Sequence, residues 1–135
     1  MNPIIHELFQ RSRKLGKELN SALKQHGLFA AQWTVIYCVY QHGEMTLTQI
    51  WRYLNVEAPT ITRTVNRLEQ MGWLATREGK DRREKYVSLT ENATVRLSEI
   101  KETIIQFEEQ SLKSLTEEEK ELLMKVLKKI SSEGE

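Results

Sequence analysis

The 135-residue sequence predicts a mainly α-helical fold with one small β-hairpin. Three observations lead to this prediction. Apolar residues recur every three or four positions along most of the chain, which is the spacing of amphipathic helices. Thr46 with Gln49, and Thr116 with Glu119, have the spacing of a capping box, which opens a helix. Around Gly79, by contrast, apolar and polar residues alternate as in two strands joined by a turn.

Length and composition indicate one globular domain, residues 1–135. Hydrophobic residues make up 39% of the chain and the net charge is only +1, which does not fit a disordered chain. No apolar run approaches the roughly 18–20 residues that cross a membrane, and the N-terminus lacks the apolar core of a secretory signal. Cys38 is the only cysteine, so no internal disulfide can form. We therefore expect a cytoplasmic protein that does not contact a membrane.

The first half of the chain predicts three helices in succession. Residues 4–24 form the first, which ends at Gly27. Residues 30–41 are nearly all apolar, which predicts a helix buried on most sides. Thr46 then caps a short helix that ends near Leu54. The apolar stripe of the first helix consists of Ile5, Leu8, Leu15, Leu19, Ala22 and Leu23.

A further helix is predicted over residues 57–71. Pro59 stands in its first turn, where the missing N–H costs little. Gly72 stands at the position where a helix commonly ends in a left-handed residue. The stripe that this helix should bury has 3–4 spacing and consists of Ile61, Val65, Leu68 and Met71.

The second half of the chain predicts a hairpin and two more helices. Residues 73–78 and 85–90 are the expected strands. Thr90 can cap a long helix over residues 91–111, and Thr116 begins the last helix. That last helix starts with acidic residues and ends with lysines, which matches the helix dipole.

The order of these elements predicts a winged helix-turn-helix, because a short helix, a turn, a second helix and a hairpin follow one another within residues 30–90. The terminal segments 1–26 and 112–135 carry more apolar surface than such a domain can cover. We therefore expect them to be dimerisation helices that bury this surface against a second copy. Residues 91–111 would then form the connecting helix.

The polar face of the helix over residues 57–71 is the first candidate site. An α-helix fits the major groove of B-DNA, and hydroxyl, amide and guanidinium groups read base edges or bind phosphates. The alternative is a solvated surface helix, but Lys or Glu would be expected there in place of threonine. The predicted DNA contacts on this helix are Thr60, Thr62, Arg63, Asn66 and Arg67.

The turn of the hairpin is the second candidate site, since the stretch TREGKDRREKY, residues 76–86, holds five basic residues. Asp81 precedes Arg83 by two positions, so its carboxylate can orient the guanidinium in a turn. An arginine held in this way can enter a narrow minor groove, where the negative potential is greatest. The predicted DNA contacts of the wing are Arg77, Arg82 and Arg83.

Two stretches together resemble the MarR-type winged-helix transcriptional regulators, and the resemblance covers essentially the whole chain. They are LTQIWRYLNVEAPTITRTVNRLEQMGWLATRE, residues 47–78, and DRREKYVSLT, residues 81–90, which fits the pattern D-x-R-x-x-x-V-x-L-T. The resemblance implies a homodimer that binds double-stranded DNA sequence-specifically at a pseudo-palindromic operator, with repression as the default. It places the 57–71 helix in the major groove and Arg83 in the minor groove. One departure is Ala93, where the family usually has glycine.

Four aromatic residues have two interpretations. Many proteins that this chain resembles have an aromatic-ligand pocket between the dimer helices and the DNA-binding winged helix-turn-helix, here called the reading head (residues 30–90). Such a pocket would imply a small aromatic effector. Aromatic residues at helical spacing also form ordinary core. The residues concerned are Trp33, Tyr37, Tyr40 and Trp51.

No other grouping in the sequence predicts chemistry. The three histidines have no paired spacing with cysteine or carboxylates, so we expect no metal. Cys38 is expected to be a buried, inert thiol in place of a redox sensor. No nucleophile–base pair or phosphate-binding loop is present, so we expect neither an enzyme nor a cofactor. A winged-helix module that binds proteins and not DNA is the alternative function, which Arg63, Arg67 and Arg83 argue against.

Overall fold

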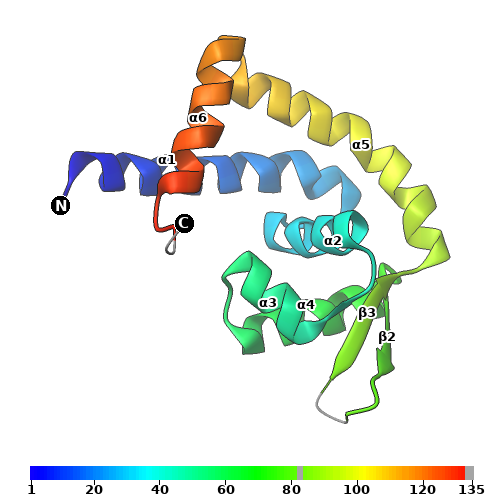
Figure 1. Cartoon of the computed structure of the whole chain (residues 1–135). Coiled ribbons are helices and arrows are strands. Elements are labelled where there is room, and N and C mark those ends of the chain that lie inside the picture. Colours follow the sequence, from blue (N-terminus) through cyan, green and yellow to red (C-terminus); the bar gives the residue numbers. More distant parts are fainter. Residues whose placement is uncertain (82–83, 133–135) are drawn as a thin grey trace.

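The computed structural model describes residues 1–81 and 84–132 and confirms the predicted fold class (Figure 1). The helices are α1 (Pro3–Leu23), α2 (Ala30–His42), α3 (Leu47–Leu54), α4 (Ala58–Gln70), α5 (Glu91–Leu112) and α6 (Glu117–Lys129). The strands are β1 (Met45–Thr46), β2 (Leu74–Glu78) and β3 (Lys85–Leu89). A 3₁₀ turn, Lys24–His26, follows α1. In Figure 1 the winged helix-turn-helix lies below α1, and α5 leads away from the wing to α6.

The predicted helix starts carry the predicted caps. The Thr46 hydroxyl accepts a hydrogen bond from the Gln49 amide N–H at 3.1 Å, and the Gln49 side chain accepts one from the Thr46 N–H at 2.9 Å. Thr116 and Glu119 make the same two bonds at 3.1 and 2.9 Å. These caps satisfy amide groups that the first turn of a helix leaves without partners, which is why the sequence locates both helix starts.

The core lies where α2, α3 and α4 pack against the small sheet, with contributions from the end of α1 and from α5. The stripe predicted on α4 is largely buried, since Ile61, Val65 and Leu68 are at most 2% exposed. Gly72 has a φ of 82°, the left-handed conformation that follows the end of α4. The apolar face therefore fixes α4 in place and leaves its polar face outward.

The sheet has one strand more than the sequence predicted. β1 pairs antiparallel with β3, and β3 pairs antiparallel with β2, so the order across the sheet is β1-β3-β2. Two residues are too few to show the alternation that reveals a strand, and Thr46 also caps α3. The short strand attaches the central strand of the wing to the start of α3.

Helix α2 is buried on one side, and the prediction that it is buried on most sides was wrong. Val35, Ile36 and Val39 are in the core, whereas Tyr37 and Tyr40 are exposed. A run that is apolar throughout has no polar face to mark its exposed side, so the sequence could not show that one side faces outward.

The start of α5 is tied to the turn between α4 and β2. The Thr90 hydroxyl accepts a hydrogen bond from the Ala93 N–H at 3.1 Å and donates one to the Gly72 carbonyl at 2.6 Å. Arg96 donates to the Met71 carbonyl at 2.9 Å, and its guanidinium carbon lies 4.0 Å from the centre of the buried Trp73 ring. These contacts join α5 to the reading head by side chains as well as by the backbone.

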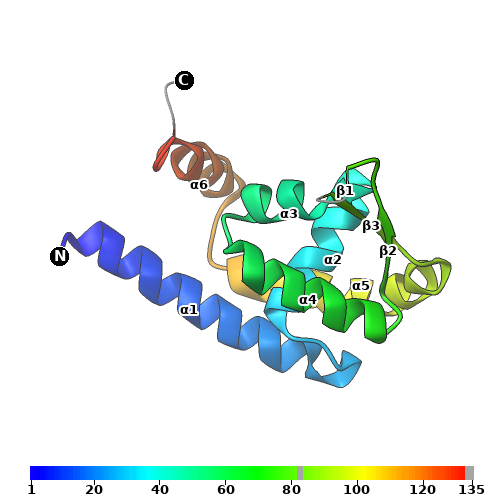
Figure 2. The same ribbon diagram turned by 90° about the horizontal axis from the view of Figure 1, so that it is seen from below.

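Helix α6 leaves its apolar side chains in solvent. Figure 1 shows that it begins at the end of α5 farthest from the wing and turns back from there, and Figure 2 shows it lying to one side of the winged helix-turn-helix. No residue of α6 is buried, and those that remain exposed include Leu122, Leu123, Met124, Val126 and Leu127. On α1 the exposed apolar residues are Ile4, Ile5, Phe9 and Leu15. None of the helices within the described residues is long and apolar enough to span a membrane.

Candidate nucleic-acid interface

The polar face of α4 lies on the surface of the molecule. Figure 2, seen from below, shows α4 on the underside beside the strands of the wing. Thr60 is half-buried, and the four other predicted contacts on this helix, Thr62, Arg63, Asn66 and Arg67, are exposed. The structure therefore brings all five together on one outward face, opposite the buried stripe.

Local hydrogen bonds hold the side chains of this face. The Thr62 hydroxyl donates to the Ala58 carbonyl at 3.1 Å, one helical turn back. Arg63 donates to the Thr60 hydroxyl at 3.5 Å, and Arg67 donates to the Gln70 side chain at 3.4 Å. These arginine bonds are long and involve neutral partners, so a phosphate or a base edge can replace them at little cost.

Backbone hydrogen bonds connect described residues on either side of the wing tip. The Gly79 N–H donates to the Glu84 carbonyl at 2.9 Å, and the Glu84 N–H donates to the Asp81 carbonyl at 2.9 Å. The Thr76 hydroxyl donates to the Glu69 carboxylate at 2.6 Å, which joins β2 to the last turn of α4. The predicted contacts Arg82 and Arg83, and with them the orientation of Arg83 by Asp81, lie outside the described residues.

Arg77, which the sequence suggested as a DNA contact, has an acidic partner. Its guanidinium donates two hydrogen bonds to the Glu44 carboxylate, from Nε at 3.1 Å and from an Nη at 2.7 Å. The bond from Arg77 lowers the pKa of the Glu44 carboxyl, so this group is ionised at neutral pH. No local pattern in the sequence predicts this pair, because its members are 33 residues apart.

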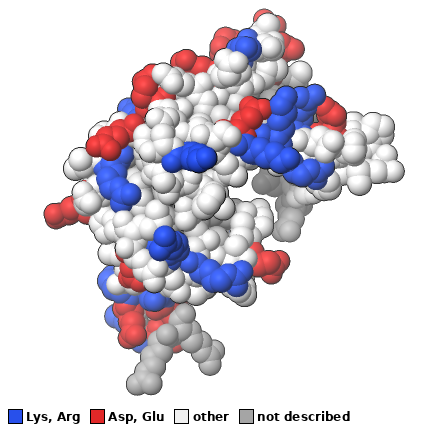
Figure 3. All heavy atoms as spheres, turned by 180° about the vertical axis from the view of Figure 1, so that it is seen from behind, with Lys and Arg blue, Asp and Glu red and all other residues white. Residues whose placement is uncertain are grey.

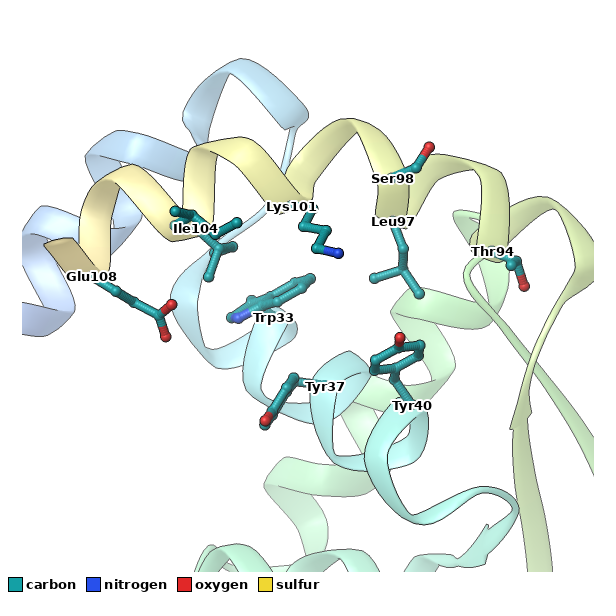
Figure 4. A pocket seen from close by; sticks show the side chains of 10 residues that line it. Trp33, Tyr37, Tyr40, Thr94, Leu97, Ser98, Lys101, Ile104 and Glu108 are labelled. Carbon is teal, nitrogen blue, oxygen red and sulfur yellow. The ribbon is translucent and has the colours of Figure 1, made fainter. Parts of the chain in front are cut away.

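A cavity of about 550 Å³ lies between α2 and α5 (Figure 4). Trp33, Tyr37 and Tyr40 line it from α2, with the centres of the Trp33 and Tyr37 rings 6.2 Å apart. The side facing them comes from α5 and carries Thr94, Leu97, Ser98, Lys101, Ile104, Ile105 and Glu108. Trp51 does not line this cavity and packs against the core instead, which agrees with the second of the two interpretations for that residue. Three of the four aromatic residues lie on α2 and Trp51 lies on α3. Their spacing in the sequence could not show that the two helices direct these side chains to different parts of the molecule.

Cys38 is 1% exposed and lies in the core. Its thiol contacts the Met45 sulfur at 3.4 Å. Burial raises the pKa of the Cys38 thiol, so the group is protonated at neutral pH and is a weak nucleophile. Among the residues that the structure describes, no group of three or more His, Cys, Asp or Glu side chains is placed to hold a metal ion.

Basic side chains are unevenly distributed over the surface. Figure 3 shows a large group of Lys and Arg over α1 and smaller groups over the lower part of the molecule near the wing, with Asp and Glu mostly toward the edges of this face. The chain as a whole carries a net charge of only +1. Local basic areas on a nearly neutral protein are the electrostatic pattern expected of a protein that meets DNA through one face.

Comparisons with known proteins agree with this geometry. Residues 28–85 match the model of the MarR family. The chain is 46% identical over 118 residues to YwoH of Bacillus subtilis (strain 168), an uncharacterized HTH-type transcriptional regulator, and the match covers 87% of this chain and 86% of that protein.

Solved structures have the same fold over nearly the whole chain. A mutant MarR from E. coli complexed with operator DNA matches with a TM-score of 0.87 and 23% identity, over 96% of this chain and 94% of that one. The transcriptional regulator PA4135 matches with a TM-score of 0.87 and 25% identity, over 100% of both chains. With an HTH-type regulator at 46% identity and this fold, the chain belongs to the MarR family of winged-helix transcriptional regulators.

Proposed function

We propose that the protein is a homodimeric transcriptional repressor that binds a pseudo-palindromic operator in double-stranded DNA. The observation that carries the proposal is the outward face of α4, with Thr62, Arg63, Asn66 and Arg67 exposed beside the wing. An α-helix that presents such groups can enter the major groove and read base edges there. Family membership supports the proposal, and E. coli MarR has been solved with operator DNA.

The proposal also assigns a role to each part of the chain. Residues 30–90 would bind DNA, residues 1–26 and 112–135 would form the dimer, and residues 91–111 would connect the two parts. The exposed apolar face of α6 supports this assignment, because a cytoplasmic protein rarely leaves such a surface uncovered. Two-fold symmetry would then place the two copies of α4 roughly 10 base pairs apart, in successive major grooves. A promoter covered in this way is closed to polymerase, which leads to repression.

The experiment that tests this function is selection of bound duplexes from random or genomic DNA, followed by titration of the selected site. We expect an inverted repeat with half-sites roughly 10 base pairs apart, centre to centre. Sedimentation of the complex should give two chains per duplex. A control duplex with one half-site scrambled should bind much more weakly. One chain per duplex, or no preference over random DNA, would contradict the proposal.

We also propose that the cavity between α2 and α5 binds a small aromatic effector. Its volume of about 550 Å³ falls within the range of small-molecule sites, and its walls combine aromatic rings with a few polar groups. Figure 4 shows Lys101 reaching from α5 toward Trp33 and Leu97. An aromatic acid could therefore stack on the α2 rings and pair its carboxylate with Lys101. A ligand held by both helices would favour one angle between them.

Titration with benzoate and its hydroxylated derivatives tests this site, with quenching of tryptophan fluorescence as the signal. Replacing Trp33 with Phe should remove most of the quenching, whereas Trp51→Phe should retain it. Lys101→Met should weaken binding of the acids by up to about fivefold, as for an exposed ion pair, and leave benzamide unaffected. Quenching that persists in Trp33→Phe would place the ligand elsewhere.

A further inference from the structure

Glu44 and Arg77 form an ion pair across the whole width of the sheet. Glu44 directly precedes β1, whereas Arg77 is in β2, and β3 lies between these two strands. The two hydrogen bonds, 3.1 and 2.7 Å long, form the forked pairing of a guanidinium with a carboxylate. This geometry fixes the orientation of both groups, which a single bond would not do.

The ring that the ion pair crosses is that of Tyr86, in the central strand. Tyr86 is the direct cross-strand partner of Arg77 in β2 and of Thr46 in β1. The guanidinium carbon of Arg77 lies 4.3 Å from the centre of the Tyr86 ring, which is within the range of a cation–π contact. Arg77 is therefore held by a carboxylate at its end and by an aromatic face beneath it.

Gly79, which directly follows β2, also packs on this ring. A Cβ added at Gly79 would come within 2.8 Å of the Tyr86 ring and within 3.2 Å of the Glu84 Cβ. Glycine therefore allows the loop to approach Tyr86 more closely than any other residue would. Through Tyr86, the Glu44–Arg77 pair contacts the loop that leads to the wing tip.

We propose that Glu44, Arg77 and Tyr86 form a clasp that fixes the wing relative to α3 and α4, and that Arg77 is a positioning residue instead of a phosphate contact. The clasp connects the segment before β1, which leads into α3, with β2, which leads into the wing. Glu44 occupies two of the five N–H donors of Arg77, and its negative charge opposes the approach of a phosphate. This inference rests on the proposed DNA binding.

The clasp should matter for binding DNA and not for folding. The Arg77 side chain is 59% exposed and that of Glu44 is 38% exposed, and an ion pair that remains in contact with solvent contributes little to stability. A wing that becomes ordered only on binding DNA, however, loses conformational entropy at that step. It therefore binds more weakly than a wing that is already ordered. Loss of the clasp should therefore weaken operator binding by about two- to tenfold, the cost of ordering one or two side chains.

The test measures operator affinity at several salt concentrations for Glu44→Ala, Arg77→Ala and the double variant. We expect the two single variants to lose the same factor and the double variant to lose no more than either. The dependence on salt should stay that of the parent protein. If Arg77 instead binds a phosphate, Arg77→Ala makes the salt slope shallower by about 0.9, and Glu44→Ala binds as tightly as the parent or tighter; this result would overturn the clasp.

Two further variants separate positioning from charge. Glu78→Ala also removes an exposed acid from the wing but leaves the clasp intact, so it should not weaken binding. The exchange Glu44→Arg with Arg77→Glu restores an ion pair in reverse, and it should recover most of the affinity that Arg77→Glu alone loses. Failure of the exchange to recover any affinity, with unchanged thermal melting, would contradict the proposal. Absence of specific binding by the parent protein would refute the proposed function itself, a result distinct from either of these.

Discussion

Removing residues 116–135 should convert the protein from a dimer to a monomer and lower its operator affinity by about two to four orders of magnitude. The truncation deletes α6, whose five exposed apolar side chains have no cover within the described chain. Two reading heads joined in one dimer bind a two-part site with an avidity that separate heads lack, and this avidity accounts for the expected loss.

Sedimentation equilibrium and mobility-shift titration measure the two effects. Leu127→Glu in the full-length chain provides a second variant, because it puts a charge on the apolar face of α6 without shortening the protein. Lys128→Glu changes the charge of the neighbouring position, and we expect it to remain a dimer. If the truncated protein still sediments as a tight dimer, α6 does not form the interface.

Replacing Arg63 with Ala should relax the base preference at particular operator positions, at a cost of about 1–3 kcal/mol where a bidentate base contact is lost. Thr62→Ala should act in the same way with a smaller effect, because a hydroxyl makes fewer contacts. Arg83→Ala provides the comparison, since the minor groove distinguishes bases poorly. That variant should weaken binding to most sites alike and make the salt slope shallower by about one unit.

A panel of single-base operator variants, measured at two salt concentrations, distinguishes these outcomes. Unchanged circular dichroism should accompany the Arg63 and Thr62 variants, because both side chains are exposed. The opposite result is that Arg83→Ala alters the base preference, while Arg63→Ala and Thr62→Ala lower the affinity for all sites alike. It would mean that the roles of the wing and α4 are reversed.

Much of the reading head could be predicted because its signals are local. The capping box at Thr46, the proline in the first turn of α4 and the glycine at φ 82° each act within a few residues of where they stand in the sequence. The stripe on α4 defines its buried face, and the exposed face then follows from helix geometry. The five candidate contacts on α4 came from this reasoning.

The remaining features depend on contacts between distant parts of the chain. Strand β1 is defined by its partner β3, about forty residues away, and not by a pattern of its own. Nothing near Glu44 in the sequence distinguishes it from an ordinary loop carboxylate, because only the sheet places it beside Arg77. The cavity likewise needs α5 opposite α2, and only this packing separates Trp33 from Trp51.

The attachment of α5 to the turn after α4 has a mechanical consequence. Thr90 and Arg96 fix one end of a 22-residue helix to the reading head, so the helix and the head must turn together. A helix of this length is about 33 Å long. A rotation of about 6° at one end therefore displaces the other by about 3.4 Å, which equals the rise of one base pair. In a dimer joined at the far ends of two such helices, a tilt this small would shift the two reading heads by about one base pair. Their spacing would then no longer match that of successive major grooves.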